Sequence, residues 1–216
     1  MEHSNSNSNK LPATTKFNHL DDDRVVQGVI LRCVDGHWSC TDDSDPPAQF
    51  VVLDTSEALQ RWEDQMPVET IRKTADEPLP DVAELNAAIP QDEWEDGIDG
   101  TPRPPWQHQF VAYLLDPKDA SIYTYLNSTT GARIAVERLQ SRMRWMQALR
   151  GVGVKPIVTL GSRPMKTKFG KKERPEFVIE KWVALDGNGG AAVETPQLTA
   201  VKEPTRQEDL KDEIRF

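Results

Sequence analysis

The residues best suited to chemistry form a basic run over residues 163–174. Six of its twelve residues are Lys or Arg, and Phe169 lies among them. Proteins that bind single-stranded nucleic acid combine cations, which displace counterions from phosphates, with aromatic rings on which bases stack. The run therefore predicts contact with single-stranded nucleic acid. The alternative is a solvated hairpin whose Phe169 packs onto the core.

The predicted interface extends to residues that flank this run. Trp182, and Trp38 elsewhere in the chain, are further candidates for base stacking, although Phe177 and Trp182 are equally suited to filling the core. We expect contact with DNA at Lys155, Arg163, Lys166, Lys168, Phe169, Lys171, Lys172, Arg174 and Trp182.

The charge of the chain is strongly segregated. The formal net charge is -9, from 26 Lys and Arg against 35 Asp and Glu. Residues 131–182 alone hold 13 Lys and Arg against 4 Asp and Glu, a net of +9, which leaves -18 for the rest. Such clustering is the electrostatic pattern expected of a nucleic-acid binder, whereas a basic surface balanced by acidic neighbours is the alternative.

The C-terminal residues form an acidic segment with apolar ends. The chain finishes Gln-Glu-Asp-Leu-Lys-Asp-Glu-Ile-Arg-Phe, which offers carboxylates for a basic rim and apolar side chains for a small pocket. This segment resembles the tip of bacterial single-stranded DNA-binding proteins, which ends in acidic residues followed by Ile-Pro-Phe. Arg215 stands where that family has Pro, and Lys211 interrupts the acidic run. The matching residues are Asp212, Glu213, Ile214 and Phe216.

The resemblance implies a tail that recruits replication or recombination proteins, or competes with DNA for a basic groove. The Pro104-Pro105-Trp106 segment and the basic run also resemble uncharacterised phage or prophage proteins. An ordinary charged terminus is the alternative interpretation of the tail.

Other groupings of reactive residues are less complete. Cys33, His37 and Cys40 supply three zinc ligands where a structural site needs four, and His108 is the only plausible distant one. The carboxylates of residues 92–99 indicate a solvated acidic loop more than a metal site. The sequence contains no P-loop, dinucleotide fingerprint, metalloprotease motif or nucleophile elbow. We therefore expect neither an enzyme nor a cofactor.

The hydrophobic pattern predicts strands at residues 24–34, 37–40, 50–53, 109–115, 121–126, 155–160 and 176–185. A short helix is predicted from Ser56, and a long one over residues 131–149 after Thr129 or Thr130. The long helix carries an apolar stripe of Ala132, Ala135, Leu139, Met143, Met146 and Leu149. Residues 75–100 hold nine acidic residues and no basic one, which indicates an acidic insertion with a short helix after Pro80.

Taking the strand at 24–34 as the first, the element order becomes β-β-β-α-β-β, as in an OB-fold. In that fold the loop between the last two strands binds oligonucleotides, and here it would be residues 161–174. We expect an α+β, mainly β, OB-fold-like barrel over residues 21–185, with the acidic, Pro-rich insertion at 75–106. Disordered termini are expected at residues 1–20 and 186–216.

Composition limits the remaining classes. Apolar residues make up 37%, the mean hydropathy is -0.62, and no apolar run approaches the length of a membrane span. The N-terminus lacks a secretory signal pattern, so we expect a cytoplasmic protein with reduced cysteines.

Together these features predict a single-stranded DNA-binding accessory protein of phage-type replication or recombination. RNA binding and self-association are left open. The alternatives are an acidic module that binds a basic protein partner and a metal-dependent nuclease.

Overall fold

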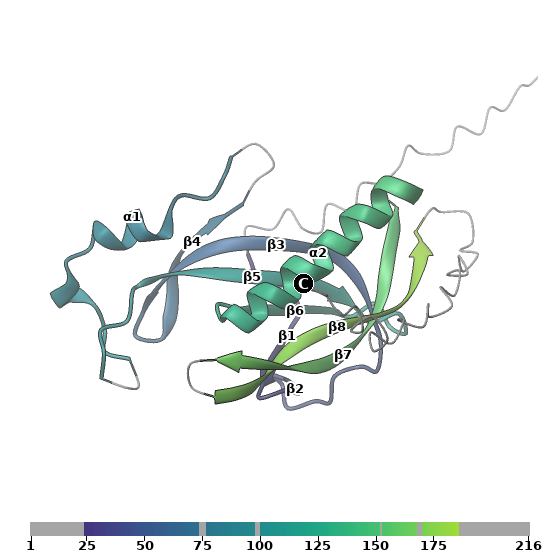
Figure 1. The fold of residues 1–216 in the computed structure, drawn as a ribbon, viewed down its shortest axis with the longest axis horizontal. Coiled ribbons are helices and arrows are strands. Elements are labelled where there is room, and N and C mark those ends of the chain that lie inside the picture. Colours follow the sequence, from purple (N-terminus) through teal and green to yellow (C-terminus); the bar gives the residue numbers. More distant parts are fainter. Residues whose placement is uncertain (1–23, 74–76, 98–99, 152, 168–169, 186–216) are drawn as a thin grey trace, which may run out of the picture.

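The computed structural model describes residues 24–73, 77–97, 100–151, 153–167 and 170–185. Within these ranges the protein is mainly β with one long helix, as predicted (Figure 1). The predicted leader and tail lie outside the described residues. The elements are β1 Val29–Val34, β2 His37–Cys40, β3 Phe50–Glu63, β4 Met66–Arg72, α1 Val82–Ala87, the 3-10 helix Gln91–Glu93, β5 Trp106–Leu115, β6 Ile122–Asn127, α2 Thr130–Arg150, β7 Val154–Thr167 and β8 Gly170–Ala184.

All eight strands belong to one sheet. The strand order is β2-β1-β6-β5-β3-β7-β8, and β4 pairs with β3. Pairing is antiparallel except between β1 and β6. Among the described residues no ladder joins β8 to β2, so the sheet is open rather than a closed barrel. Its two ends are nevertheless linked, because Trp38 Nε1 of β2 donates a hydrogen bond to the Gly161 carbonyl of β7 at 2.8 Å.

β3 is the longest link in this sheet. It pairs with β5 from Val51 to Arg61 and with β7 at its first two residues. A bulge between Val52 and Asp54 bends it, so that one strand serves two differently oriented partners. The chain order β3, β5, β6, α2, β7, β8 is therefore the observed β-β-β-α-β-β succession. The strand near residue 50, rather than the predicted one at 24–34, begins it.

The predicted short helix from Ser56 is wrong, because residues 56–63 continue β3. The spacing of Leu59 and Trp62 fits a helical face, but this stretch pairs with β4 on one edge and with β5 on the other. Backbone pairing on both edges, together with the burial of Ala58 and Leu59, outweighs the local spacing.

Helix α2 crosses one face of the sheet, as Figure 1 shows. Its start is the predicted one, since the Thr129 hydroxyl accepts a hydrogen bond from the Ala132 amide at 3.3 Å. The first four residues of the predicted apolar stripe are buried, and Met146 is half-buried. Leu149 departs from the prediction with 77% of its surface exposed, so the last turn of the helix offers no side chain to the core.

The opposite face of β5 and β6 is covered by residues 24–28. The predicted strand over 24–34 is shorter than expected, because β1 begins only at Val29. Tyr113 Oη donates to the Val25 carbonyl at 3.0 Å, and Thr124 Oγ1 donates to the Gln27 carbonyl at 2.6 Å. Residues 24–28 therefore close this face of the sheet.

Candidate nucleic-acid interface

The basic run predicted as a loop is largely strand. β7 and β8 pair continuously up to Thr167 and Gly170, which leaves a two-residue connection. Gly170 has φ +105°, a left-handed conformation that suits glycine at such a turn. Lys168 and Phe169 form this connection and lie outside the described residues.

The register of the hairpin places like charges directly opposite one another. Lys166 pairs with Lys171, and Arg163 pairs with Arg174. Directly opposed like charges destabilise a sheet, because cross-strand side chains lie only about 5 Å apart. The hairpin thus concentrates positive charge at a cost in stability, and an anion on this surface would offset that cost.

Three lysines of the predicted interface, Lys166, Lys171 and Lys172, are exposed on this hairpin. Lys172 Nζ lies 3.6 Å from an Asp35 carboxylate oxygen. The Arg163 guanidinium is also at the surface, where its Nε donates to Glu176 at 2.9 Å. These four cations form the accessible part of the predicted set.

Three other predicted contacts are placed inside the fold. Trp182 is only 5% exposed and belongs to the hydrophobic core, the alternative considered for it from sequence. Arg174 is 7% exposed, and its guanidinium donates to the Pro175 carbonyl at 3.2 Å. Lys155 Nζ donates to the Leu53 carbonyl at 2.7 Å. Their side chains stabilise the fold, and the accessible surface is formed without them.

Helix α2 contributes arginines that were not among the predicted contacts. Arg138 Nη1 lies 3.7 Å from Glu176, the same carboxylate that binds Arg163 of β7. Arg138, Arg142, Arg174 and Glu176 line a narrow crevice between α2 and β8. The helix and the hairpin therefore share one basic surface. The signal in the sequence was the position of Arg138 and Arg142 off the apolar stripe.

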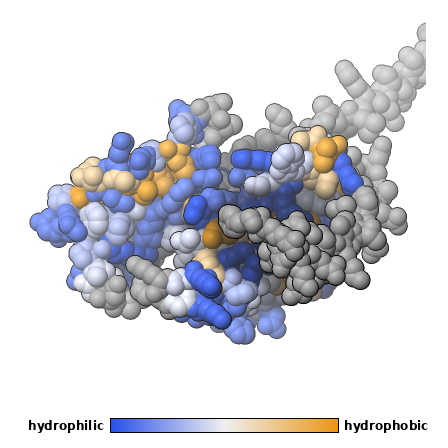
Figure 2. Space-filling view, viewed as in Figure 1, coloured by the Kyte–Doolittle hydropathy of each residue, from blue (hydrophilic) through white to orange (hydrophobic). Residues whose placement is uncertain are grey.

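The aromatic residues divide sharply by exposure. The Trp38 ring lies 5.1 Å from Tyr125 and 5.6 Å from Phe177, and its N–H is bonded as described above. Phe177 is buried. Among the described aromatic residues, Trp145 of α2 stands apart with 73% of its surface exposed. Figure 2 shows hydrophilic surface around a hydrophobic area at the C-terminal end of this helix.

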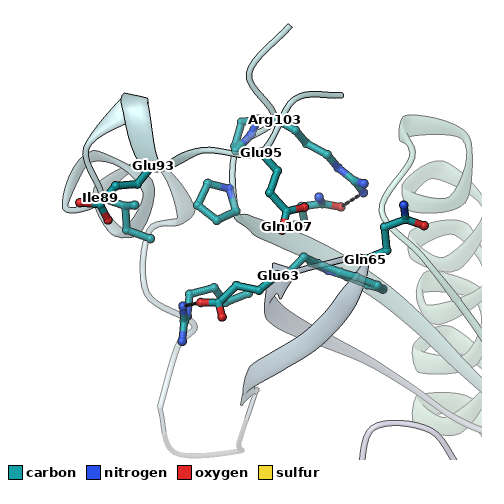
Figure 3. Close-up of a pocket in the computed structure, with 11 residues that line it drawn as sticks. Glu63, Gln65, Ile89, Glu93, Glu95, Arg103 and Gln107 are labelled. Carbon is teal, nitrogen blue, oxygen red and sulfur yellow. Dashed lines mark hydrogen bonds and ion pairs between the residues drawn. The ribbon is translucent and has the colours of Figure 1, made fainter. Parts of the chain in front are cut away.

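A pocket of about 170 Å³ lies at the opposite, acidic part of the molecule. Glu63 and Gln65 approach it from the β3–β4 turn, whereas Glu93 and Glu95 approach from the insertion (Figure 3). The Trp62 indole N–H is buried at its edge and has no hydrogen-bond partner among the described residues. The insertion is thus folded around a pocket rather than being a bare acidic loop.

The two cysteines are free thiols on β1 and β2. Burial is the main cause that raises the pKa of both Cys33 and Cys40, so both remain protonated near neutral pH and are poor nucleophiles. In the described part of the chain, no group of three or more His, Cys, Asp and Glu residues could hold a metal ion. No helix within the described ranges is long and apolar enough to cross a membrane.

No protein-family model, curated protein or solved structure matches this chain. Its function is therefore inferred from its own geometry.

Proposed function

We propose that this protein binds single-stranded DNA, largely independently of sequence, through the β7–β8 hairpin and the adjoining face of α2. The observation that carries this proposal is the pairing of Lys166 with Lys171 and of Arg163 with Arg174 across the hairpin. A surface selected only for stability would alternate charge signs, because opposed cations repel. Phosphates placed along the hairpin would relieve this repulsion and release their condensed counterions.

The connectivity supports an OB-type arrangement for the proposed binder. The strand order β3-β5-β6, a helix, and then β7-β8 follows that fold, and bent β3 pairs with both β5 and β7. In this assignment β1 and β2 are an additional hairpin placed against β6. The β7–β8 turn then occupies the position of the loop that binds oligonucleotides in OB-folds.

The role in replication or recombination, and in a phage setting, is proposed from the resemblance at the C-terminus. Asp212, Glu213, Ile214 and Phe216 would recruit partner proteins, while the hairpin would hold DNA. These four residues lie outside the described part of the chain, so the partner is proposed from their chemistry alone.

The proposal is tested by titrating the protein with fluorescein-labelled oligothymidine at several salt concentrations. We expect binding that weakens linearly in log K against log salt, because each phosphate contact releases counterions. Absence of binding at low salt would refute the proposal.

The acidic pocket supports a second candidate function, the docking of a basic protein segment. Its Glu93 and Glu95 carboxylates could accept a Lys or Arg side chain, and the unpaired Trp62 N–H could donate to a peptide carbonyl. This function predicts that an Arg-rich peptide binds and that Glu93→Gln with Glu95→Gln weakens it. Oligothymidine affinity should be unaffected by that change.

A further inference from the structure

The outer face of α2 exposes a stripe that the core does not use. Trp145 and Leu149 are 73% and 77% exposed. A shallow groove along the same face is lined by Ile134, Glu137, Arg138, Ser141, Arg142 and Trp145. An exposed tryptophan costs solvation free energy without contributing to packing, so this position calls for a binding partner.

The charge of this region limits the chemistry of that partner. From Arg138 to Lys172 the sequence contains no Asp or Glu, and it contains ten Lys or Arg residues. Arg142 and Arg144 have no ion pair with any described residue. A helical protein partner would require apolar side chains along the groove, but two of its six lining residues are arginine. A polyanion matches the groove better.

The position of the stripe connects it with the hairpin. Glu176 holds Arg138 of α2 and Arg163 of β7 on one carboxylate, so the two basic surfaces are continuous. Seven residues separate Arg138 from Trp145, which corresponds to about 10 Å along the helix axis and nearly two full turns. The two side chains therefore lie on the same side of α2, which fits a strand running lengthwise.

The alternative surface for a nucleic acid is already occupied. In OB-folds the second and third strands contact the oligonucleotide. Here residues 24–28 cover one face of β5 and β6, and the hydrophobic core formed with α2 covers the other. A strand leaving the hairpin thus has the outer face of α2 as its basic and exposed continuation.

We propose that Trp145 is a base-stacking platform and that Arg138 and Arg142 hold the phosphates beside it, so that single-stranded nucleic acid runs from the β7–β8 turn along α2. This rests on the proposed function and defines its substrate class. Stacking requires bases that are free of a complementary strand, so duplex DNA would gain only the phosphate contacts.

The test compares Trp145→Ala and Trp145→Phe with the unaltered full chain, using labelled oligothymidine, oligouridine and duplex DNA. Trp145→Ala should weaken binding of the single strands by about 5- to 150-fold, the loss expected for one stacked base. Trp145→Phe should retain most of the affinity, since phenylalanine keeps an aromatic face. Leu149→Ala, which removes an equally exposed side chain without an aromatic ring, is the matched control and should have little effect.

A second readout follows tryptophan fluorescence. Bases stacked on an exposed indole should quench it, and Trp145→Phe should abolish most of that quenching while binding persists. Thermal unfolding of each variant checks that the fold is intact, which is expected because Trp145 makes no core contact.

The outcomes separate the two proposals. If the unaltered protein binds neither oligonucleotide, the proposed function fails. If it binds and Trp145→Ala has the same affinity, only the stacking platform is refuted. Equal affinity for duplex and single strands would also refute it, as would a variant that changes the oligomeric state but not the affinity, since the stripe would then join two copies of the chain. A difference between oligothymidine and oligouridine identifies the preferred nucleic acid.

Discussion

The opposed lysines of the β7–β8 hairpin predict that one substitution has opposite effects on stability and on binding. In the double variant Lys166→Gln, Lys171→Gln, a like-charge pair is replaced by two neutral side chains that can hydrogen-bond. Cross-strand pairs are worth about 0.2–1 kcal/mol, so the free energy of unfolding should rise by a few tenths of a kcal/mol. Both residues are exposed, so salt should screen this gain and reduce it at high ionic strength.

Binding of single-stranded DNA should change in the other direction. Each phosphate contact contributes about -0.7 to the slope of log K against log salt, so losing two contacts should reduce the slope by about 1.4. At 0.1 M salt this corresponds to an affinity about 25-fold lower. Fluorescence polarisation with labelled oligothymidine measures the slope, and urea denaturation measures the stability.

The matched control is Lys118→Gln, Lys181→Gln, which removes the same charge from exposed positions outside the hairpin tip. Its slope should change much less than that of the tip variant. Equal reductions in both variants would mean that overall charge, rather than this hairpin, governs binding. A tip variant that is less stable than the unaltered protein would contradict the repulsion inferred from the register.

Three further predictions concern the scaffold. Gly28→Ala should lower the free energy of unfolding by at least about 2 kcal/mol in urea denaturation, because φ is +65° and the new Cβ would lie 1.9 Å from the Ile122 carbonyl oxygen. Gly100→Ala, with φ +70° and open space, should cost less, and an equal cost would show that crowding is irrelevant. Trp182→Ala should cost about 3–5 kcal/mol, whereas Trp182→Phe should leave oligothymidine affinity unchanged; lost affinity at full stability would contradict its burial. Burial raises the pKa of the Tyr125 hydroxyl well above its usual range, so the unfolded chain loses that proton first as pH rises. Above about pH 10 the free energy of unfolding should therefore fall by up to about 1.4 kcal/mol per pH unit, and Tyr125→Phe should reduce the slope measured by denaturation at each pH.

Elements with a strong local pattern could be predicted from the sequence. The Thr129 cap and the apolar spacing after it specify α2, since both act within a few turns of the chain. The acidic insertion was likewise predicted to contain a short helix, and α1 lies there. The charge segregation also follows from the sequence alone, because it needs no knowledge of which residues meet.

Predictions that depended on partners from distant parts of the chain were less accurate. Residues 56–63 have helical spacing, yet they form strand because β4 and β5 bind both of their edges. Leu149 continues an apolar stripe, yet it is exposed, because no sheet residue reaches the last turn of α2. In both cases the outcome depends on what lies opposite, which the local sequence does not contain.

The same distinction applies to the candidate site. The sequence by itself determined that a basic segment with aromatic residues exists, and that the long helix places several arginines off its apolar stripe. Only the tertiary structure decided which of these groups reach solvent: it buries Trp182 and Arg174, exposes Trp145, and joins Arg138 to Arg163 through Glu176. The physical reason is that charge and hydrophobicity are properties of each residue, whereas burial and cross-strand register arise from long-range packing.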